Sequence, residues 1–232
     1  MEHTKRQNLD AAVAGLKQRF GSRIVHPLGE AEAVVALSTS FAKLDAALGI
    51  GGIPRGHLTE LVGAPTSGVH TLASKLIASA HQAGEMAVYL DLSHTFDPDY
   101  TVRCGVNIAN LLLVRPRSSD EALDMAYTFL MERGAGVIVF DESLFKAATR
   151  VSFAPVLHTL AGSGCAMLRL ATWGSQSASV RLQLTRERWL GQRRDVSGYR
   201  TRVRILKNKF APPAEEVCLT IGFHGVVNGD GV

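Results

Sequence analysis

Apolar residues recur at helical spacing near the start of the chain, and short apolar runs alternate with such stretches after it. The first stripe stops before Gly21 and predicts a helix with one apolar face. Its members are Leu9, Val13, Leu16 and Phe20. The chain after this helix contains no internal repeat or low-complexity linker. We therefore predict an N-terminal helical arm at residues 1–33 and one core domain at residues 34–232.

Strands and helices are predicted to alternate through most of the core. Apolar runs predict strands at residues 34–37, 57–62, 86–91, 111–114, 137–140 and 166–170. Helical spacing predicts helices at residues 41–48, about 69–83, about 153–161, and after Ser118 and Glu121, which form a capping box. Apolar strands separated by helices are typical of an α/β fold with a mostly parallel central sheet and helices on both faces.

The last part of the chain changes to longer strands without helices between them. The predicted strands cover residues 180–189, 199–209 and 216–221. We expect these strands to be antiparallel and to extend the sheet at its C-terminal edge.

The segment from Gly63 to His70 matches a phosphate-binding loop in its glycines but departs from it in its chemistry. The working pattern is Gly, four residues, Gly, Lys and then Ser or Thr, between a strand and a helix. Gly63 and Gly68 keep this spacing, but Val69 replaces the lysine and His70 replaces the hydroxyl that holds magnesium. Valine cannot neutralise phosphate, and histidine is a poor ligand for magnesium. We predict a tight turn without catalysis, metal or bound cofactor, and weak nucleotide or phosphate binding to its backbone stays open.

Two other predicted strands end in residues that nucleotide chemistry would use. Asp141 stands where phosphate-loop enzymes hold a carboxylate that orders magnesium through water. We favour a helix cap at Asp141, because His70 offers no partner for a metal. A general base is expected near Asp91 and His94, where the alternatives are a turn-capping aspartate and a solvated histidine.

The composition indicates a globular protein. Hydrophobic residues make up 46% of the chain and charged residues 20%, with no run of about 20 apolar residues and no signal peptide, so we expect a cytoplasmic protein with no membrane contact. The cysteines have no metal-ligand spacing and lie in or next to apolar runs, which predicts buried free thiols in a reducing compartment. They are Cys104, Cys165 and Cys218.

Positive charge is concentrated in one segment. Residues 180–210 contain ten Lys or Arg and two acids, a net charge of +8, whereas the rest of the chain carries −4. Arg200, Arg202 and Arg204 alternate with apolar or small residues and should share one strand face, with Arg181 on the preceding hairpin. Other arginines of that hairpin are Arg186, Arg188, Arg193 and Arg194. Such a face could follow the phosphates of single-stranded DNA, with Trp189 and Tyr199 stacking on bases, or it could be a solvated face that pairs with acids.

Several segments together resemble the bacterial RecA recombinase core over nearly the whole chain. They are residues 5–7 and 18–30 of the arm, 37–40 and 44–56 before the loop, 94–100 after the strand at 86–91, and 202–212 with the Lys207-Asn208-Lys209 motif. The resemblance implies a RecA-like fold. It also implies that the arm, including its apolar stripe, and Lys207 and Lys209 contact a neighbouring subunit.

Departures from that family are concentrated at its catalytic and DNA-binding positions. The family's loop lysine and threonine fall at Val69 and His70, and its catalytic glutamate falls at Ser93. Asp141 alone remains of the metal-ordering set. The two loops that bind single-stranded DNA are mostly missing, after Asp141 and after Leu170, and the C-terminal domain has no counterpart.

These losses resemble the ImuA branch of the family. The resemblance implies a non-catalytic adaptor in the SOS response to DNA damage. Such an adaptor would bind RecA and an ImuB-type polymerase-like protein during mutagenic translesion synthesis. Lys207 and Lys209 would then reach the nucleotide of a RecA neighbour. The alternatives are a single-stranded DNA-binding module, an ATPase with a degenerate loop, and a cell-division inhibitor of RecA-like fold.

Overall fold

The computed structural model describes residues 2–20, 34–142, 152–192, 195–212, 216–223 and 228–229. Contacts within the chain divide it into two compact units, Met1–Ala33 and Val34–Val232. The first unit contains helix α1 (Glu2–Phe20). Leu9 and Leu16 of its predicted apolar stripe are 63% and 43% exposed.

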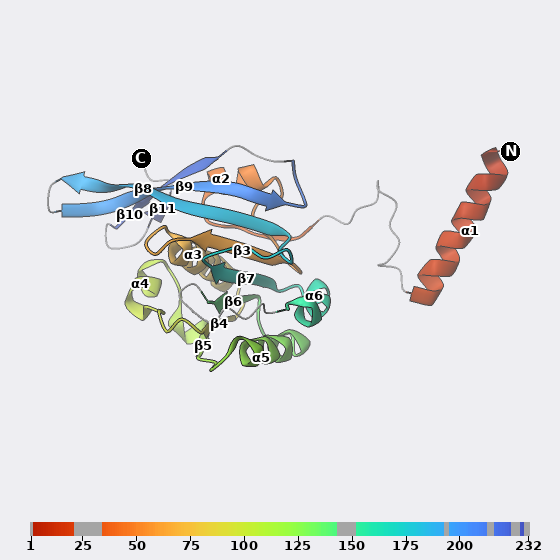
Figure 1. The fold of residues 1–232 in the computed structure, drawn as a ribbon, viewed down its shortest axis with the longest axis horizontal. Helices are drawn as coiled ribbons and strands as arrows, with labels where there is room; N and C mark the ends of the chain where they lie inside the picture. The colour runs from red at the N-terminus through yellow and green to blue at the C-terminus, as the bar shows by residue number, and fades with distance from the viewer. Residues whose placement is uncertain are drawn as a thin grey trace. The chain divides into compact units, whose positions relative to one another are not determined.

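The second unit is built on a nine-stranded sheet with the order β11-β10-β9-β8-β3-β7-β6-β4-β5 in the described part of the chain (Figure 1). Strands from β5 to β8 in this order are parallel to their neighbours, and β8 to β11 are antiparallel. The strands are β3 (Leu58–Gly63), β4 (Ala87–Asp91), β5 (Leu111–Val114), β6 (Val137–Asp141), β7 (Ala166–Ala171), β8 (Val180–Gln192), β9 (Asp195–Asn208), β10 (Val217–Gly222) and β11 (Asn228–Gly229). The predicted α/β class with an antiparallel edge is confirmed.

Helices cover both faces of this sheet. They are α2 (Ala42–Leu48), α3 (Val69–Gln82), α4 (Pro98–Arg103), the short 3-10 helix η1 (Ile108–Asn110), α5 (Ser119–Met131) and α6 (Ala154–Ala161). Alternate residues of β6 enter two separate cores: Val137 and Val139 pack with α3, whereas Ile138 and Phe140 pack with α5 and α6. This alternation explains why β6 is apolar at every position before Asp141.

Local sequence signals place most elements within one or two residues of their predicted bounds. Ser118 Oγ accepts a hydrogen bond from Glu121 N–H at 3.2 Å, so the predicted start of α5 is confirmed. The predicted strand at 34–37 shortens to β1 (Ala36–Leu37), which pairs with β2 (Ile53–Pro54) in a separate two-stranded sheet. The pattern did not predict α4, which Asp97 caps by accepting from Tyr100 N–H.

The long hairpin of β8 and β9 confirms the predicted alternation. Thr201 and Val203 are buried, whereas Arg202 and Arg204 are exposed. Register shifts interrupt the hairpin at three places, one of them between Arg186 and Arg188. This irregularity reverses which face the following side chains occupy. Arg193 and Arg194 lie outside the described residues.

The cysteines are free, and their environments differ. Cys104 and Cys165 are buried, and burial raises their pKa values to about 11 and about 12. Cys218 is half-buried beside the Glu187 carboxylate, so the expectation that it is buried is wrong. No helix among the described residues combines the length and the apolar character needed to cross a membrane.

Candidate functional site

The loop from Gly63 to Gly68 joins β3 to α3, as the sequence predicts. A Cβ atom on Gly63 would lie 2.4 Å from Ser67 Oγ and 2.7 Å from the carbonyl oxygen of Leu184. Gly68 has a φ of +103° and is the N-cap of α3. Both glycines are therefore required by the close approach and backbone conformation of the turn, whatever ligand it holds.

Asp141 is fully buried at the end of β6, and its Oδ2 atom faces three side chains of the protein. Tyr89 donates its hydroxyl at 2.7 Å, Thr95 donates at 3.2 Å, and His70 Nε2 lies at 3.1 Å. Burial, and then the Asp141 charge, raise the pKa of Tyr89 well above its usual value, so the phenol remains a proton donor. Among the described helices, α6 is capped by Phe153 and not by Asp141. The residues that directly follow Glu142, where a helix capped by Asp141 would begin, lie outside the described residues, so the helix-cap interpretation stays a prediction.

This arrangement does not fit a magnesium nucleotide. His70 comes from the position where the family has its magnesium-binding hydroxyl, and it contacts the carboxylate that would order the metal. Magnesium requires nearly octahedral oxygen coordination, which an imidazole in this place does not supply. Val69 contributes no positive charge to replace the metal. Asp141 and the side chains around it thus satisfy one another's hydrogen-bonding groups at the place where the family binds a cation.

The end of β4 contains no described carboxylate placed as a general base. Asp91 Oδ1 accepts from Thr95 N–H at 3.0 Å, which confirms the turn-cap interpretation. His94 is exposed and has a φ of +53°. Ser93 Oγ donates to the carbonyl oxygen of Asp141 at 3.3 Å. The turn after β4 therefore supports Asp141 and its surroundings.

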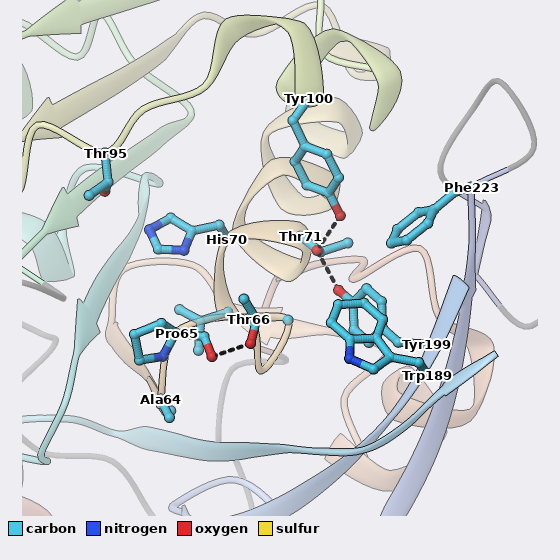
Figure 2. Close-up of a pocket in the computed structure, with 13 residues that line it drawn as sticks. Ala64, Pro65, Thr66, His70, Thr71, Thr95, Tyr100, Trp189, Tyr199 and Phe223 are labelled. Carbon is cyan, nitrogen blue, oxygen red and sulfur yellow. Dashed lines mark hydrogen bonds between the residues drawn. The ribbon is translucent and has the colours of Figure 1, made fainter. Parts of the chain in front are cut away.

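A cavity of about 370 Å³ lies between this loop and the antiparallel strands (Figure 2). Four aromatic side chains from different elements line it: Tyr100, Trp189, Tyr199 and Phe223. The Thr71 hydroxyl shares hydrogen bonds of 2.6 Å with both Tyr100 and Tyr199. Burial raises the pKa of both phenols, so they remain neutral at physiological pH.

The sequence patterns do not predict this cavity. Trp189 and Tyr199 are predicted only to lie beside a basic segment, and no pattern indicates a role for Thr71, Tyr100 or Phe223 in a site. Tyr199 is paired with Trp189 across the hairpin. The ring centroids of Tyr199 and Phe223 are 5.7 Å apart. These residues are far apart in sequence, and no local pattern indicates their convergence on the phosphate loop.

The arginines of the basic face are paired with carboxylates. Arg200 lies 3.1 Å from Glu187, and Arg204 lies 2.6 Å from Glu216. Arg202 contacts both acids, with a hydrogen bond of 2.8 Å to Glu187. Arginines and glutamates thus form a network of ion pairs on this face. This matches the alternative prediction, in which the face is solvated and its arginines pair with acidic residues.

Arg181 lies instead in a buried ion cluster around Glu60. Glu60 is fully buried and accepts from Arg181 Nε at 2.8 Å, Arg169 Nη1 at 2.8 Å and Ser175 N–H at 2.9 Å. Although burial raises the pKa of Glu60, these hydrogen bonds lower it below its usual value. Ser175 belongs to the short loop after β7, so the cluster fixes a loop that the family resemblance marks as shortened. Arg181 is less accessible than the sequence led us to expect.

Lys207 and Lys209 differ in their surroundings. Lys207 Nζ donates to the carbonyl oxygen of Gln176 at 2.9 Å, and burial with the nearby Lys209 charge lowers its pKa. Lys209 is exposed. In the arm, Leu9 and Leu16 are exposed and Val13 is half-buried, whereas the Phe20 side chain lies outside the description.

Comparison with known proteins gives concordant matches. The family model for the RecA N-terminal domain matches residues 7–150. Protein RecA of Chloroflexus aurantiacus is 32% identical over 250 residues, which cover 90% of this chain and 71% of that protein. Protein RecA of Acidiphilium cryptum is 30% identical over 254 residues, covering 92% and 74%. The crystal structure of the RadB recombinase has a similar fold, with a TM-score of 0.65, 18% identity, and coverage of 83% of this chain and 98% of that one.

Proposed function

The chain belongs to the RecA family, and from this premise we propose that it is a non-catalytic adaptor in DNA-damage tolerance. We place it in the ImuA branch, with RecA and an ImuB-type polymerase-like protein as partners in SOS-induced translesion synthesis. Its proposed role is to contact these proteins without hydrolysing ATP.

The observation that carries this proposal is the set of three side chains that surround the Asp141 carboxylate. An ATPase of this family needs that carboxylate for a metal and needs a lysine on the outer phosphates. In this chain His70, Tyr89 and Thr95 converge on the carboxylate, and Val69 replaces the lysine. A cation at this place would have to displace protein contacts that stabilise a buried charge.

Two further features favour contact with other proteins. The arm exposes Leu9 and Leu16 on one face of α1, and exposed apolar stripes are typical of helices that pack on a partner. Lys209 is exposed, as expected of a side chain that reaches a neighbouring subunit. Lys207 is less available, because its ammonium group is bonded to the Gln176 carbonyl.

The alternative of a single-stranded DNA-binding module is weaker for a specific reason. Its predicted arginines already have partners in Glu187, Glu216 and Glu60. Phosphate binding would have to compete with these carboxylates, which reduces the gain from counterion release.

The test combines partner capture with turnover. The purified full chain, immobilised and exposed to a lysate of DNA-damaged cells, should capture RecA and the ImuB-type protein, identified by mass spectrometry. It should release no phosphate from magnesium ATP above the background. Capture of the division tubulin without RecA would favour the cell-division inhibitor. Turnover that Asp141→Ala abolishes would establish the ATPase alternative.

A variant separates the role of the lysine motif from partner binding. Lys207→Ala with Lys209→Ala should change the ATPase rate of RecA in the presence of the chain, if these side chains reach a neighbour's nucleotide. Lys43→Ala, an exposed lysine on α2, is the control and should leave that rate unchanged. Equal RecA rates and equal RecA binding in both variants would remove the lysine motif from the proposal.

A further inference from the structure

The cavity beside the phosphate loop is lined by aromatic side chains, as expected of a site that binds a planar ring. Tyr100, Trp189, Tyr199 and Phe223 line it together with the loop, and Thr71 lies between Tyr100 and Tyr199 (Figure 2). Ring faces of this kind bind planar ligands by stacking. None of the described residues that line it is Lys, Arg, Asp or Glu, and the histidine among them, His70, lies 3.1 Å from the Asp141 carboxylate through its Nε2 atom. The cavity itself therefore offers shape and stacking but no formal charge from these residue types.

Arg186 supplies a positive charge at the edge of this cavity. Its guanidinium donates to the Thr66 hydroxyl of the phosphate loop and lies over Trp189, 4.3 Å from the ring centroid. Both Thr66 and Trp189 line the cavity. Arg186 is paired across the hairpin with the buried Thr201, whose hydroxyl donates to the Ser67 carbonyl oxygen, so this face of β8 is directed at the loop.

The Arg186 guanidinium of β8 thus places a positive charge beside the loop. In the working pattern the cation follows the second glycine, where this chain has Val69. Arg186 comes from β8, and its stack on Trp189 positions the guanidinium without a carboxylate partner among the described ion pairs. A guanidinium held in this way remains able to bind an anion.

The charge balance limits what the cavity can hold. A triphosphate brings several negative charges, and the Asp141 surroundings do not fit the magnesium that would neutralise them. Its excess charge would be left unpaired against aromatic walls, which is costly. A neutral ring would leave the guanidinium without an anion. A single negative charge matches the single guanidinium.

We propose that this cavity binds a planar aromatic compound carrying one negative charge, without a divalent metal, and that Arg186 is its anion contact. This site goes beyond the adaptor role, because partner capture does not depend on it. The proposal and the adaptor role can therefore fail independently.

Isothermal titration of the full chain tests the proposal with two monoanions and their neutral counterparts. The probes are 3′,5′-cyclic AMP with adenosine, and 1-naphthalenesulfonate with 1-naphthol. At least one monoanion should bind about tenfold more tightly than its neutral counterpart, as expected for a charge-assisted hydrogen bond. It should also bind more tightly than magnesium ATP, and chelation of divalent metal should not change its affinity.

Arg186→Gln should lower the ratio of the affinity for the monoanion to the affinity for its neutral counterpart to about one. The affinity for the neutral ring should stay unchanged, which also shows that the variant is folded. Arg188→Gln is the matched control: it removes one charge from the same strand, beyond the register shift and opposite Arg200. It should keep the full preference. The proposal is overturned if neither monoanion binds, if magnesium ATP binds more tightly, or if both variants keep the same preference.

Discussion

Asp141 and Glu60 are buried carboxylates that the protein satisfies in different ways. Asp141 accepts from Tyr89 and Thr95 and lies within hydrogen-bond distance of His70. Glu60 is satisfied mainly by two arginines and a loop amide. A buried charge without such partners would cost several kcal/mol. Individual substitutions at these positions therefore change stability and loop geometry together.

The surroundings of Glu60 predict that the free energy of unfolding depends on pH in the acid range. The pKa of Glu60 in the folded chain is lowered from the ordinary value of 4.5, mainly through hydrogen bonds that outweigh burial. Its stabilisation is therefore complete above about pH 4.5 and is lost as the pH falls through the lower, folded pKa. Glu60→Gln should lower the free energy of unfolding by about 3 kcal/mol at pH 7 and flatten the loss in acid. Urea unfolding from pH 7 to pH 3 measures both effects.

Glu132→Gln is the control for this prediction. Glu132 is exposed at the end of α5, so its substitution should change stability by less than about 0.5 kcal/mol at every pH. The quantity to compare is the difference between each variant and the wild type, because other carboxylates also titrate in acid. If Glu60→Gln has the same small effect as Glu132→Gln, the buried cluster does not stabilise the fold.

The hairpin of β8 and β9 shows how neighbouring strands change the chemistry of a basic stretch. Arg200, Arg202 and Arg204 share a face, but β8 contributes Glu187 beside them and Glu216 lies just before β10. Each acid contacts two arginines, so the positive field of this segment is partly cancelled. The charge of the hairpin depends on which strands pair with it, and a count along the chain cannot show this.

Removing the two acids should expose the arginines to nucleic acid. Glu187→Gln with Glu216→Gln should bind a labelled single-stranded oligonucleotide about tenfold more tightly than the wild type at about 50 mM salt. The gain should shrink at about 200 mM salt, because phosphate contacts release counterions. Fluorescence anisotropy gives both affinities.

Asp120→Asn with Asp124→Asn changes the net charge by the same amount on α5, away from the arginines. This control should bind like the wild type. A similar gain in both double variants would mean that net charge, and not the Arg200 face, governs binding.

In the whole molecule, the arm and the core form separate compact units. The core has its own two apolar clusters, one on each side of the sheet, whereas α1 exposes Leu9 and Leu16. A helix of this kind gains most of its stability from packing of an apolar face on something else. Within the proposed function, that surface belongs to RecA.

Charges placed on the apolar stripe of the arm test this assignment. Leu9→Asp with Leu16→Asp should weaken RecA binding at least about tenfold, because two apolar contacts are replaced by charges that must be desolvated. Surface plasmon resonance with RecA assembled on single-stranded DNA measures the affinity.

Ala11→Asp with Gln18→Asp is the control. It has the same seven-residue separation and also places two aspartates on α1, but on the opposite helical face. It should leave RecA binding within about threefold of the wild type. Equal loss in both variants would indicate an effect on the helix itself rather than on a docking face.

Local patterns were enough to predict the parallel sheet, the helices on both of its faces and the turn at Gly63 and Gly68. Apolar periodicity and backbone requirements act over a few residues, so they can be read directly from the chain. The loss of the lysine and hydroxyl at Val69 and His70 is equally visible there. The same signals did not predict the partner of the strand at 34–37, because strand pairing is non-local.

The functional surroundings of these residues depended on contacts between distant segments. The chain alone favoured a helix cap at Asp141, whereas the folded core brings His70 of α3, Tyr89 of β4 and Thr95 of the following turn to its carboxylate. Likewise, the arginines acquire carboxylate partners and Arg186 reaches the phosphate loop only when β8, β9 and β3 assemble. Buried charge must find a partner in three dimensions, and the identity of that partner follows from strand order and register rather than from neighbours in sequence.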